Sequence, residues 1–273
     1  MRRHLVRLIQ GYFRTIFKAE LVRGKDLEIL QIDSQRYRDL LRWQKNPISA
    51  DLYSYISKNM EKSKSQLQQD LFANYLMESL DSNDNNYFVE FGCTDGVKIS
   101  NTFLLEKEFG WTGIVVEPAR VWHKDLLLNR NCKIDFACVY GSTGMNLEFI
   151  ESKEAEYSTL FSYENGDYHK RIIANRYTVQ TISLNDLLIK YDAPRKINYL
   201  SIDTEGSEYE ILKNFDFLDY SFDFISVEHN FGINRDDVRI LLETHGYVRI
   251  LSEISVFEDW FIAHNIATQL DFI

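Results

Sequence analysis

Two carboxylates and two glycines stand where they could bind a nucleoside. Glu90 and Gly92 lie at the end of one apolar stretch, Gly96 follows in a short turn, and Glu117 ends the next apolar stretch. A glycine lets the backbone approach a ligand closely, and a carboxylate at the end of a second strand accepts hydrogen bonds from both ribose hydroxyls. The patterns G-x-G-x-x-G and G-x-x-x-x-G-K-[ST], which bind phosphates, are absent from the sequence. A nucleoside without a pyrophosphate, such as S-adenosylmethionine, therefore fits better than NAD or ATP.

A second group of polar residues follows two later apolar stretches. Asp203 and Glu205 come after residues 197–202, and Glu228 and His229 come after residues 222–227. Methyl transfer from a sulfonium is an in-line displacement that depends on the position of the acceptor oxygen. A general base within hydrogen-bond reach of an acceptor hydroxyl adds about 10²–10⁴-fold to the rate. We predict His229 as this base because imidazole titrates near neutrality. Asp203 and Glu205 are further catalytic candidates, and Asp203 would orient the base, accept the proton itself or contact the ammonium of the cofactor.

The carboxylates of this second group also have the chemistry of Mg²⁺ or Mn²⁺ ligands, and such an ion acidifies a hydroxyl in some sugar methyltransferases. Carboxylates at strand ends are common in any enzyme that binds a nucleoside. We therefore assign no metal ligand and keep dependence on a divalent ion as an alternative.

Strand and helix patterns alternate from residue 87 onward and would position these groups. The predicted strands cover residues 87–91, 113–117, 133–140, 177–182, 197–202, 222–227, 247–251 and 256–262. The predicted helices cover residues 100–109, 119–128, 183–190, 208–215 and 235–245, and residues 141–176 form a less regular insertion. This alternation predicts an α/β fold with a mostly parallel sheet, helices on both faces and one antiparallel strand near the C-terminus. Ligands of such sheets bind at the carboxyl ends of the strands, which is where both polar groups stand.

The N-terminal region has helical patterns instead. Residues 37–43, 49–60 and 65–80 are predicted helices, with a break at Pro47. Residues 1–25 carry a net charge of +6, and their pattern predicts a helix with one apolar face and an opposite basic face. Such a helix binds an anionic membrane surface with about 1 kcal/mol per basic residue, or packs on its own protein or on a second copy, which is the commoner arrangement.

Composition narrows the function classes further. The formal net charge is −10, and residues 26–273 carry −16, which argues against a nucleic-acid footprint because that needs a basic surface. No apolar stretch approaches the roughly 20 residues of a membrane-spanning helix, and we expect no secretory signal. The three cysteines do not suggest a disulfide framework. We therefore expect a cytoplasmic protein, either free or peripheral to the inner face of a membrane.

Several of these segments together resemble the FkbM family of methyltransferases. They are Phe88–Gly96, Ser100–Thr102, Leu105–Lys107, Gly110–Gly113 and Val116–Pro118. Residues 202–208 resemble the second signature of the family, D-x-E-G-x-E. The resemblance covers about residues 64–265 and implies a Rossmann-like class I domain that methylates oxygen with S-adenosylmethionine. We accordingly expect a helical extension over residues 1–63 and a methyltransferase domain over residues 64–273.

The resemblance also implies roles for single residues. Glu90, Gly92, Asp95 and Gly96 would line the methionine moiety, with Ser100 at the start of the following helix. Glu117 would bind the ribose, and the segment from Asp135 through Val139, with Asp135 and Ala137, would contribute to the adenine pocket. Cys93 and Thr94 replace an Ala-Asn pair that is common in the family, so this sequence differs in the methionine pocket.

The sequence therefore predicts an O-methyltransferase for a hydroxyl of a sugar, sugar nucleotide or glycan, with its acceptor specificity in residues 141–176. Two alternatives are a methyltransferase for RNA or protein and a non-catalytic scaffold. The expected partner is a small-molecule or glycan acceptor rather than nucleic acid. Self-association or peripheral membrane contact would involve the N-terminal helices.

Overall fold

The computed structural model describes residues 35, 37–46, 48–82, 85–166 and 169–272. The chain divides into two units, Met1–Lys45 and Asn46–Ile273, which we describe separately. In the first unit, residues 37–45 are helical, as predicted for residues 37–43. The basic amphipathic pattern of residues 1–25 lies outside the described residues. The division into an extension of residues 1–63 and a domain of residues 64–273 stays a prediction.

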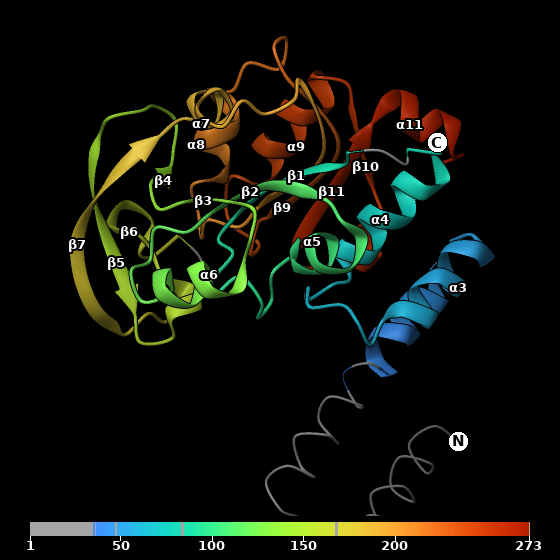
Figure 1. Cartoon of the computed structure of the whole chain (residues 1–273), viewed down its shortest axis with the longest axis horizontal. Coiled ribbons are helices and arrows are strands. Elements are labelled where there is room, and N and C mark those ends of the chain that lie inside the picture. Colours follow the sequence, from blue (N-terminus) through green and yellow to red (C-terminus); the bar gives the residue numbers. More distant parts are fainter. Residues whose placement is uncertain (1–34, 36, 47, 83–84, 167–168, 273) are drawn as a thin grey trace, which may run out of the picture. The chain divides into compact units, whose positions relative to one another are not determined.

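The second unit is built around a twisted seven-stranded sheet (Figure 1). Its strands are β1 (Tyr87–Phe91), β2 (Thr112–Val116), β3 (Lys133–Asp135), β8 (Lys196–Ile202), β9 (Ser221–Glu228), β10 (Tyr247–Ile250) and β11 (Glu258–Ala263). The strand order is β10-β11-β9-β8-β1-β2-β3, and β11 is antiparallel to both of its neighbours. All other pairs in this sheet are parallel. The predicted Rossmann-like α/β class, with one antiparallel strand near the C-terminus, is confirmed.

Helices cover both faces of this sheet. They are α3 (Ala50–Asn59), α4 (Gln69–Ser79), α5 (Phe103–Phe109), α6 (His123–Asn129), α7 (Leu184–Lys190), α8 (Glu208–Lys213), α9 (Arg235–Thr244), α10 (Ser252–Ser255) and α11 (His264–Gln269). Short α10 lies between the last two predicted strands, and α11 was not predicted. Successive side chains of a strand point to opposite faces. Ile225 of β9 therefore joins the core of α7, α8 and α9, whereas Phe224 packs on Phe72 of α4, with ring centroids 5.0 Å apart.

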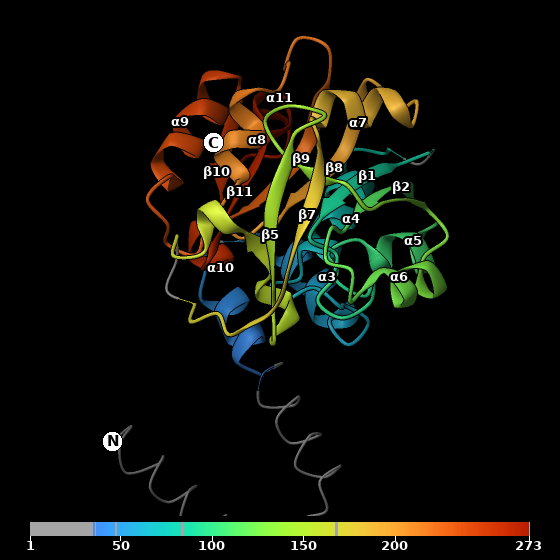
Figure 2. The same cartoon turned by 90° about the vertical axis from the view of Figure 1, so that its left-hand side faces the viewer.

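A second, four-stranded sheet replaces the irregular insertion that the sequence predicted (Figure 2). Its strands are β4 (Cys138–Val139), β5 (Asn146–Ser152), β6 (Thr159–Leu160) and β7 (Ile173–Ile182), in the order β4-β7-β5-β6. The 3₁₀ turns η1 (Ala155–Tyr157) and η2 (Phe161–Tyr163) flank β6. The expectation of irregular structure over residues 141–176 was wrong because β5 and β7 pair antiparallel along their length.

The predicted single strand over residues 133–140 was also wrong. The chain turns after β3, where the Asp135 carboxylate accepts a hydrogen bond from the backbone N–H of Ala137. β3 pairs with β2 in the main sheet, and β4 pairs with β7 in the second sheet. This turn is what carries the chain from one sheet to the other. Among the described residues, no helix combines the length and the apolar character needed to cross a membrane.

Candidate active site

A cavity opens at the carboxyl ends of β1, β2 and β8, and we call it the β1–β2 cavity. Gly92, Glu117 and Asp203 line it at the ends of these three strands. Its apolar walls include Trp122, Cys138, Phe149 and Leu160. Sequence reasoning missed Trp122, Phe149 and Leu160. Phe149 and Leu160 belong to β5 and β6, which were not predicted.

Glu117 presents its carboxylate to this cavity from a buried position. One oxygen accepts a hydrogen bond from the backbone N–H of Thr94 at 3.0 Å, and the other accepts one from Ala119 at 2.9 Å. Burial raises the pKa of Glu117 to about 8, against these two hydrogen bonds, which lower it. Each carboxylate oxygen has more than one lone-pair site, so the group keeps the capacity to accept two hydroxyl donors.

Glu90 and Ser100 lie behind the cavity rather than in its wall. The buried Glu90 carboxylate accepts hydrogen bonds from the Ser100 hydroxyl, the Thr102 hydroxyl and the backbone N–H of Asn101. The fully buried Arg130 guanidinium lies 3.5 Å from Glu90 and donates to Ser100 and Thr102. This network fixes the loop between β1 and α5. Sequence reasoning missed Arg130.

The other predicted cofactor residues hold the chain around the cavity. The Asp95 carboxylate accepts hydrogen bonds from the backbone N–H groups of the next turn. A Cβ atom on Gly96 would come within 2.7 Å of the Arg130 side chain, so Gly96 packs under α6. Asp135 is buried and accepts hydrogen bonds from Ala137 N–H and from Lys190 Nζ. None of Asp95, Gly96, Asp135 and Ala137 lines the β1–β2 cavity in this structure.

Three carboxylates converge at the ends of β8 and β9. Oxygens of Asp203, Glu205 and Glu228 all lie within 4.8 Å of one another. Glu205 is buried and paired with the Arg171 guanidinium at 2.7 Å. Burial raises the pKa of Asp203 to about 7, and burial together with the negative charge of Asp203 raises the pKa of Glu228. We infer that Asp203 and Glu228 share a proton near neutral pH, as two adjacent carboxyl groups do.

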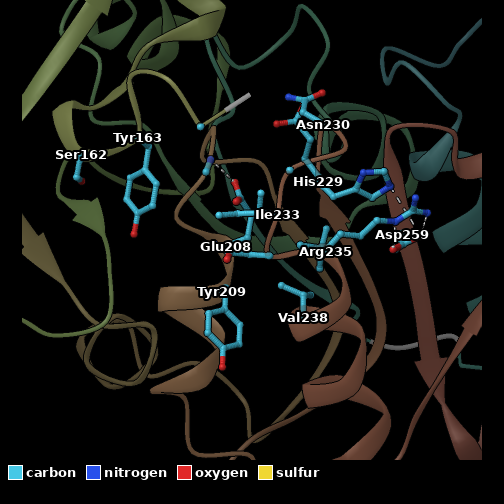
Figure 3. A pocket seen from close by; sticks show the side chains of 16 residues that line it. Ser162, Tyr163, Glu208, Tyr209, His229, Asn230, Ile233, Arg235, Val238 and Asp259 are labelled. Carbon is cyan, nitrogen blue, oxygen red and sulfur yellow. Dashed lines mark hydrogen bonds and ion pairs between the residues drawn. The ribbon is translucent and has the colours of Figure 1, made fainter. Parts of the chain in front are cut away.

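A second cavity lies beyond this cluster, and we call it the β9 cavity (Figure 3). Glu228, His229 and Asn230 line it at the end of β9, together with Arg235 of α9. In Figure 3 the His229 ring and the Arg235 guanidinium converge on Asp259, while Tyr163 and Tyr209 lie on the other side. The two cavities are adjacent because Glu205 and Ser207 line the first, whereas Gly206 and Glu208 line the second.

The loop of the D-x-E-G-x-E segment is closed by its own last residue. Glu208 Oε1 accepts hydrogen bonds from the backbone N–H groups of Thr204 and Gly206 and from the Thr204 hydroxyl. A Cβ atom on Gly206, whose φ is +123°, would come within 3.0 Å of the Tyr163 side chain. A glycine is needed here for two reasons. Other residues rarely adopt this backbone conformation, and Tyr163 occupies the space that a side chain would need.

His229 has a different environment from the one expected of a general base. Its Nδ1 accepts a hydrogen bond from the backbone N–H of Phe231 at 3.0 Å. Burial lowers the pKa of His229 to about 4. The nitrogen that faces Asp259, Nε2, lies 3.8 Å from the nearest carboxylate oxygen. The structure thus brings Asp203 and Glu205 together with Glu228, and it places His229 in the wall of the neighbouring cavity.

Comparison with known proteins identifies the family of the chain. Residues 86–249 match the family model described as the methyltransferase FkbM domain. The chain belongs to the FkbM family of methyltransferases. It is an S-adenosylmethionine-dependent enzyme, as the resemblance in its motifs implies. No curated protein matches its sequence.

Solved structures with some likeness include the plantazolicin methyltransferase BpumL in complex with SAH. That match has 12% identity and a TM-score of 0.29, and it covers 85% of this chain and 70% of the BpumL chain. BpumL in complex with a triazolic desmethylPZN analog and SAH matches with 12% identity and a TM-score of 0.29, covering 83% of this chain and 68% of that chain.

The lining of the β1–β2 cavity is compatible with a nucleoside such as that of S-adenosylmethionine. Glu117 offers hydrogen-bond acceptors at a strand end, where a ribose would present two hydroxyl donors. The walls formed by Trp122, Val139 and Phe149 suit the apolar faces of an adenine. Gly92 leaves the backbone exposed at the mouth of β1.

Proposed function

We propose that the chain transfers a methyl group from S-adenosylmethionine to a hydroxyl of a sugar, a sugar nucleotide or a glycan. The observation that carries the proposal is the junction of the two cavities at three carboxylates. Asp203 and Glu205 line the β1–β2 cavity, Glu228 lines the β9 cavity, and the oxygens of all three lie within 4.8 Å. A hydroxyl bound in the β9 cavity would face the cofactor across this cluster.

The β1–β2 cavity would hold the cofactor, which supplies an electrophilic methyl group on its sulfonium when bound. Glu117 would accept hydrogen bonds from the ribose hydroxyls, and Gly92 would present its backbone to the methionine moiety. Glu90, Asp95, Gly96 and Ser100 would act by holding the loop after β1. Asp135 and Ala137 would fix the chain next to the adenine. The hydrogen bonds of the loop and the lining of the cavity support these roles.

The Asp203–Glu228 pair would accept the proton of the acceptor hydroxyl. A base is most effective when its pKa lies near the working pH, and the pKa of Asp203 is raised to about 7. Glu205 would stay ionised in its pair with Arg171 and position the Asp203–Glu228 pair rather than accept the proton. His229 was the base that the sequence predicted. Its hydrogen bond with the backbone N–H of Phe231 instead favours a role as a hydrogen-bond donor through its other ring nitrogen.

The chemistry of the β9 cavity supports a hydroxylated acceptor. Tyr163 and Tyr209 offer apolar ring faces, and Glu208, Asn230 and Arg235 offer polar atoms around them. A cavity with aromatic walls and a few convergent polar groups suits a ligand with both apolar and hydroxyl surface.

Calorimetric titration with S-adenosylhomocysteine tests the cofactor site. We expect micromolar binding by the native chain and a loss of at least tenfold, about 1.4 kcal/mol, in Glu117→Ala. The matched control is Glu148→Ala, since Glu148 is an exposed carboxylate on β5. Failure of the native chain to bind S-adenosylhomocysteine would overturn the proposal and favour a non-catalytic scaffold.

The basic arm over residues 1–25 motivates a further part of the proposal, contact with an anionic membrane or with a second copy of the chain. Flotation with vesicles that contain anionic lipid, using the full chain and a chain that lacks residues 1–25, tests the membrane contact. Equal partitioning of the two proteins would exclude it. Sedimentation of the same pair would then test self-association.

A further inference from the structure

The loop that follows β9, residues 229–234, holds two buried donors that have no partner. His229 Nε2 and Asn230 Nδ2 are closed to solvent and make no hydrogen bond. Buried polar groups in folded proteins are nearly always paired, so two exceptions on adjacent residues of one cavity wall need an explanation. A ligand oxygen is the partner that such donors lack.

The position of the proton on His229 follows from its neighbours. Nδ1 accepts the backbone N–H of Phe231, and an amide N–H acts only as a donor, so Nδ1 carries no proton. The proton of the neutral ring therefore resides on Nε2. Burial lowers the pKa of His229 to about 4, which keeps the ring neutral at physiological pH. His229 is thus a hydrogen-bond donor at Nε2, the nitrogen on the side of Asp259, and not an acceptor there.

Asp259 does not satisfy this donor. Its two oxygens accept hydrogen bonds from Arg235 at 2.9 and 2.8 Å, and Arg249 lies 3.6 Å away. The 3.8 Å between His229 Nε2 and Asp259 is longer than a hydrogen bond. Nε2 faces a carboxylate that is already engaged by two guanidinium groups.

The backbone of the same loop is strained. Asn230 has a φ of +39° and Phe231 a φ of +57°, a region that side chains other than glycine rarely adopt. Phe231 is 61% exposed and contacts His229 and Arg235 through its ring, and Ile233 is 93% exposed, so the outer part of the loop lies at the surface. Unpaired donors and a strained backbone both disfavour this conformation, and a shift of the loop on ligand binding would relieve both.

The charges of the β9 cavity select against an anion. Among the described residues that line it, Arg235 is the one guanidinium or ammonium group, and Asp259 engages it with two hydrogen bonds. Glu208 and Glu228 line the same cavity. A phosphate or carboxylate placed here would face carboxyl groups without a free cation.

We propose that the loop of residues 229–234 recognises an uncharged, polyhydroxylated part of the acceptor, with His229 Nε2 and Asn230 Nδ2 donating hydrogen bonds to its oxygens. The inference rests on the proposed function, since it assigns the acceptor to the β9 cavity. It narrows that function to acceptors whose bound part is a neutral sugar. The phosphates of a sugar nucleotide would lie outside the cavity.

Nitrogen NMR of the histidine rings tests the proposal, first on the native chain alone and then on the chain saturated with S-adenosylhomocysteine, to which the sugars are added. The probes are the neutral methyl glycosides of glucose, galactose, mannose and rhamnose, each compared with the 1-phosphate of the same sugar. Loss of a signal in His229→Asn assigns the ring, and His264→Asn is the control because His264 is exposed. We expect the proton on Nε2 before any addition, and a shift of this signal with at least one glycoside and with none of the phosphates.

Binding by variants gives a second, independent readout. His229→Gln keeps an N–H donor and should bind the responsive glycoside within threefold of the native chain, whereas His229→Leu should bind it at least tenfold more weakly. The affinity for S-adenosylhomocysteine should stay the same in both. A proton on Nδ1, an equal response to the phosphates, no response to any glycoside, or equal binding by His229→Leu would each overturn the proposal. Failure of the native chain to bind S-adenosylhomocysteine would instead count against the proposed function, because the position of the proton is measured without it.

Discussion

A Cβ atom placed on Gly92 would lie 1.9 Å from the carbonyl oxygen of Asp203. The loop that leaves β1 and the loop that leaves β8 are therefore in direct backbone contact at the mouth of the β1–β2 cavity. Strand pairing brings this about, because β1 and β8 are parallel neighbours and Phe91 is in register with Ile202. The loop after β1 and the carboxylate of Asp203 are thus placed by a single strand pair.

This contact predicts the effect of a single methyl group. Gly92→Ala should unfold more easily than the native chain and lose S-adenosylhomocysteine binding, since the clash with Asp203 displaces both loops. Gly144→Ala is the matched control, because Gly144 has a φ of +84° but nothing within 4 Å of a Cβ atom. It should cost about 1 kcal/mol of stability and leave binding intact. Thermal unfolding and calorimetry check both, and equal behaviour of the two variants would contradict the argument.

Cofactor binding should release a proton. The pKa of Glu117 is raised to about 8 by burial, so the carboxyl group is mostly protonated at pH 7 in the free protein. Hydrogen bonds from two ribose hydroxyls favour the ionised form and lower this pKa. We expect nearly one proton released per S-adenosylhomocysteine at pH 7, and an affinity that rises as the pH approaches 8. Titration in two buffers of different ionisation enthalpy measures this, and Glu117→Gln should abolish the release.

Arg130 should be among the most sensitive positions for stability. Its fully buried guanidinium pairs with Glu106 at 2.6 Å and lies 3.5 Å from Glu90. Removing one partner leaves buried carboxylates without compensation, so Arg130→Met should lower the free energy of unfolding by about 3–5 kcal/mol. Arg239→Met is the control, because Arg239 makes exposed ion pairs on α9 that contribute at most about 1 kcal/mol. Chemical denaturation that shows similar losses for both would contradict a structural role of Arg130.

The pH dependence of turnover distinguishes the two candidate bases. A base must be deprotonated to act, so the rate rises as the pH passes the pKa of the base. If Asp203 takes the proton, the rate should rise through about pH 7, whereas His229 would give a rise near pH 4 and a plateau above it. We expect the first profile, and a loss of about 10²–10⁴-fold in Asp203→Asn. Asp219→Asn, in an exposed pair with Arg195, should change neither the profile nor the rate.

Turnover should be unaffected by EDTA. Asp203, Glu205 and Glu228 are close enough to bind a divalent ion together. Glu205 is already paired with Arg171, however, and a proton shared by Asp203 and Glu228 neutralises part of their charge. Electron paramagnetic resonance of added Mn²⁺ measures binding directly. Loss of turnover in EDTA that Mg²⁺ or Mn²⁺ restores would show that the cluster is a metal site.

The sequence predicted the main sheet well because its central strands are short segments in which apolar residues predominate. Residues 197–202 and 222–227 are buried on both faces, so their pattern has one interpretation. In the second sheet, residues 177–182 of β7 and the residues of β4 were predicted as strand, and β5, β6 and the start of β7 were missed. Residues 173–178 of β7 are all exposed or half-buried, and its partner β5 is connected through two short turns that no spacing rule marks.

The candidate site was predictable where a side chain belongs to a strand end. Glu117, Asp203 and Glu228 stand where the sequence placed them. The need for a cation beside Glu90 follows from a carboxylate inside an apolar strand, but its identity as Arg130 depends on how α6 packs. The environment of His229 was also beyond prediction, because it depends on the fold of the next two residues.

The second sheet contributes to both cavities through neighbouring residues. Leu160 ends β6 in the wall of the β1–β2 cavity, and Tyr163, three residues later, lies in the wall of the β9 cavity. Exchanging this segment for that of a relative, in order to redirect the enzyme to another acceptor, would therefore also alter the fit of the methyl donor. Acceptor preference is better engineered from α9 and the loop before it, which line the β9 cavity alone.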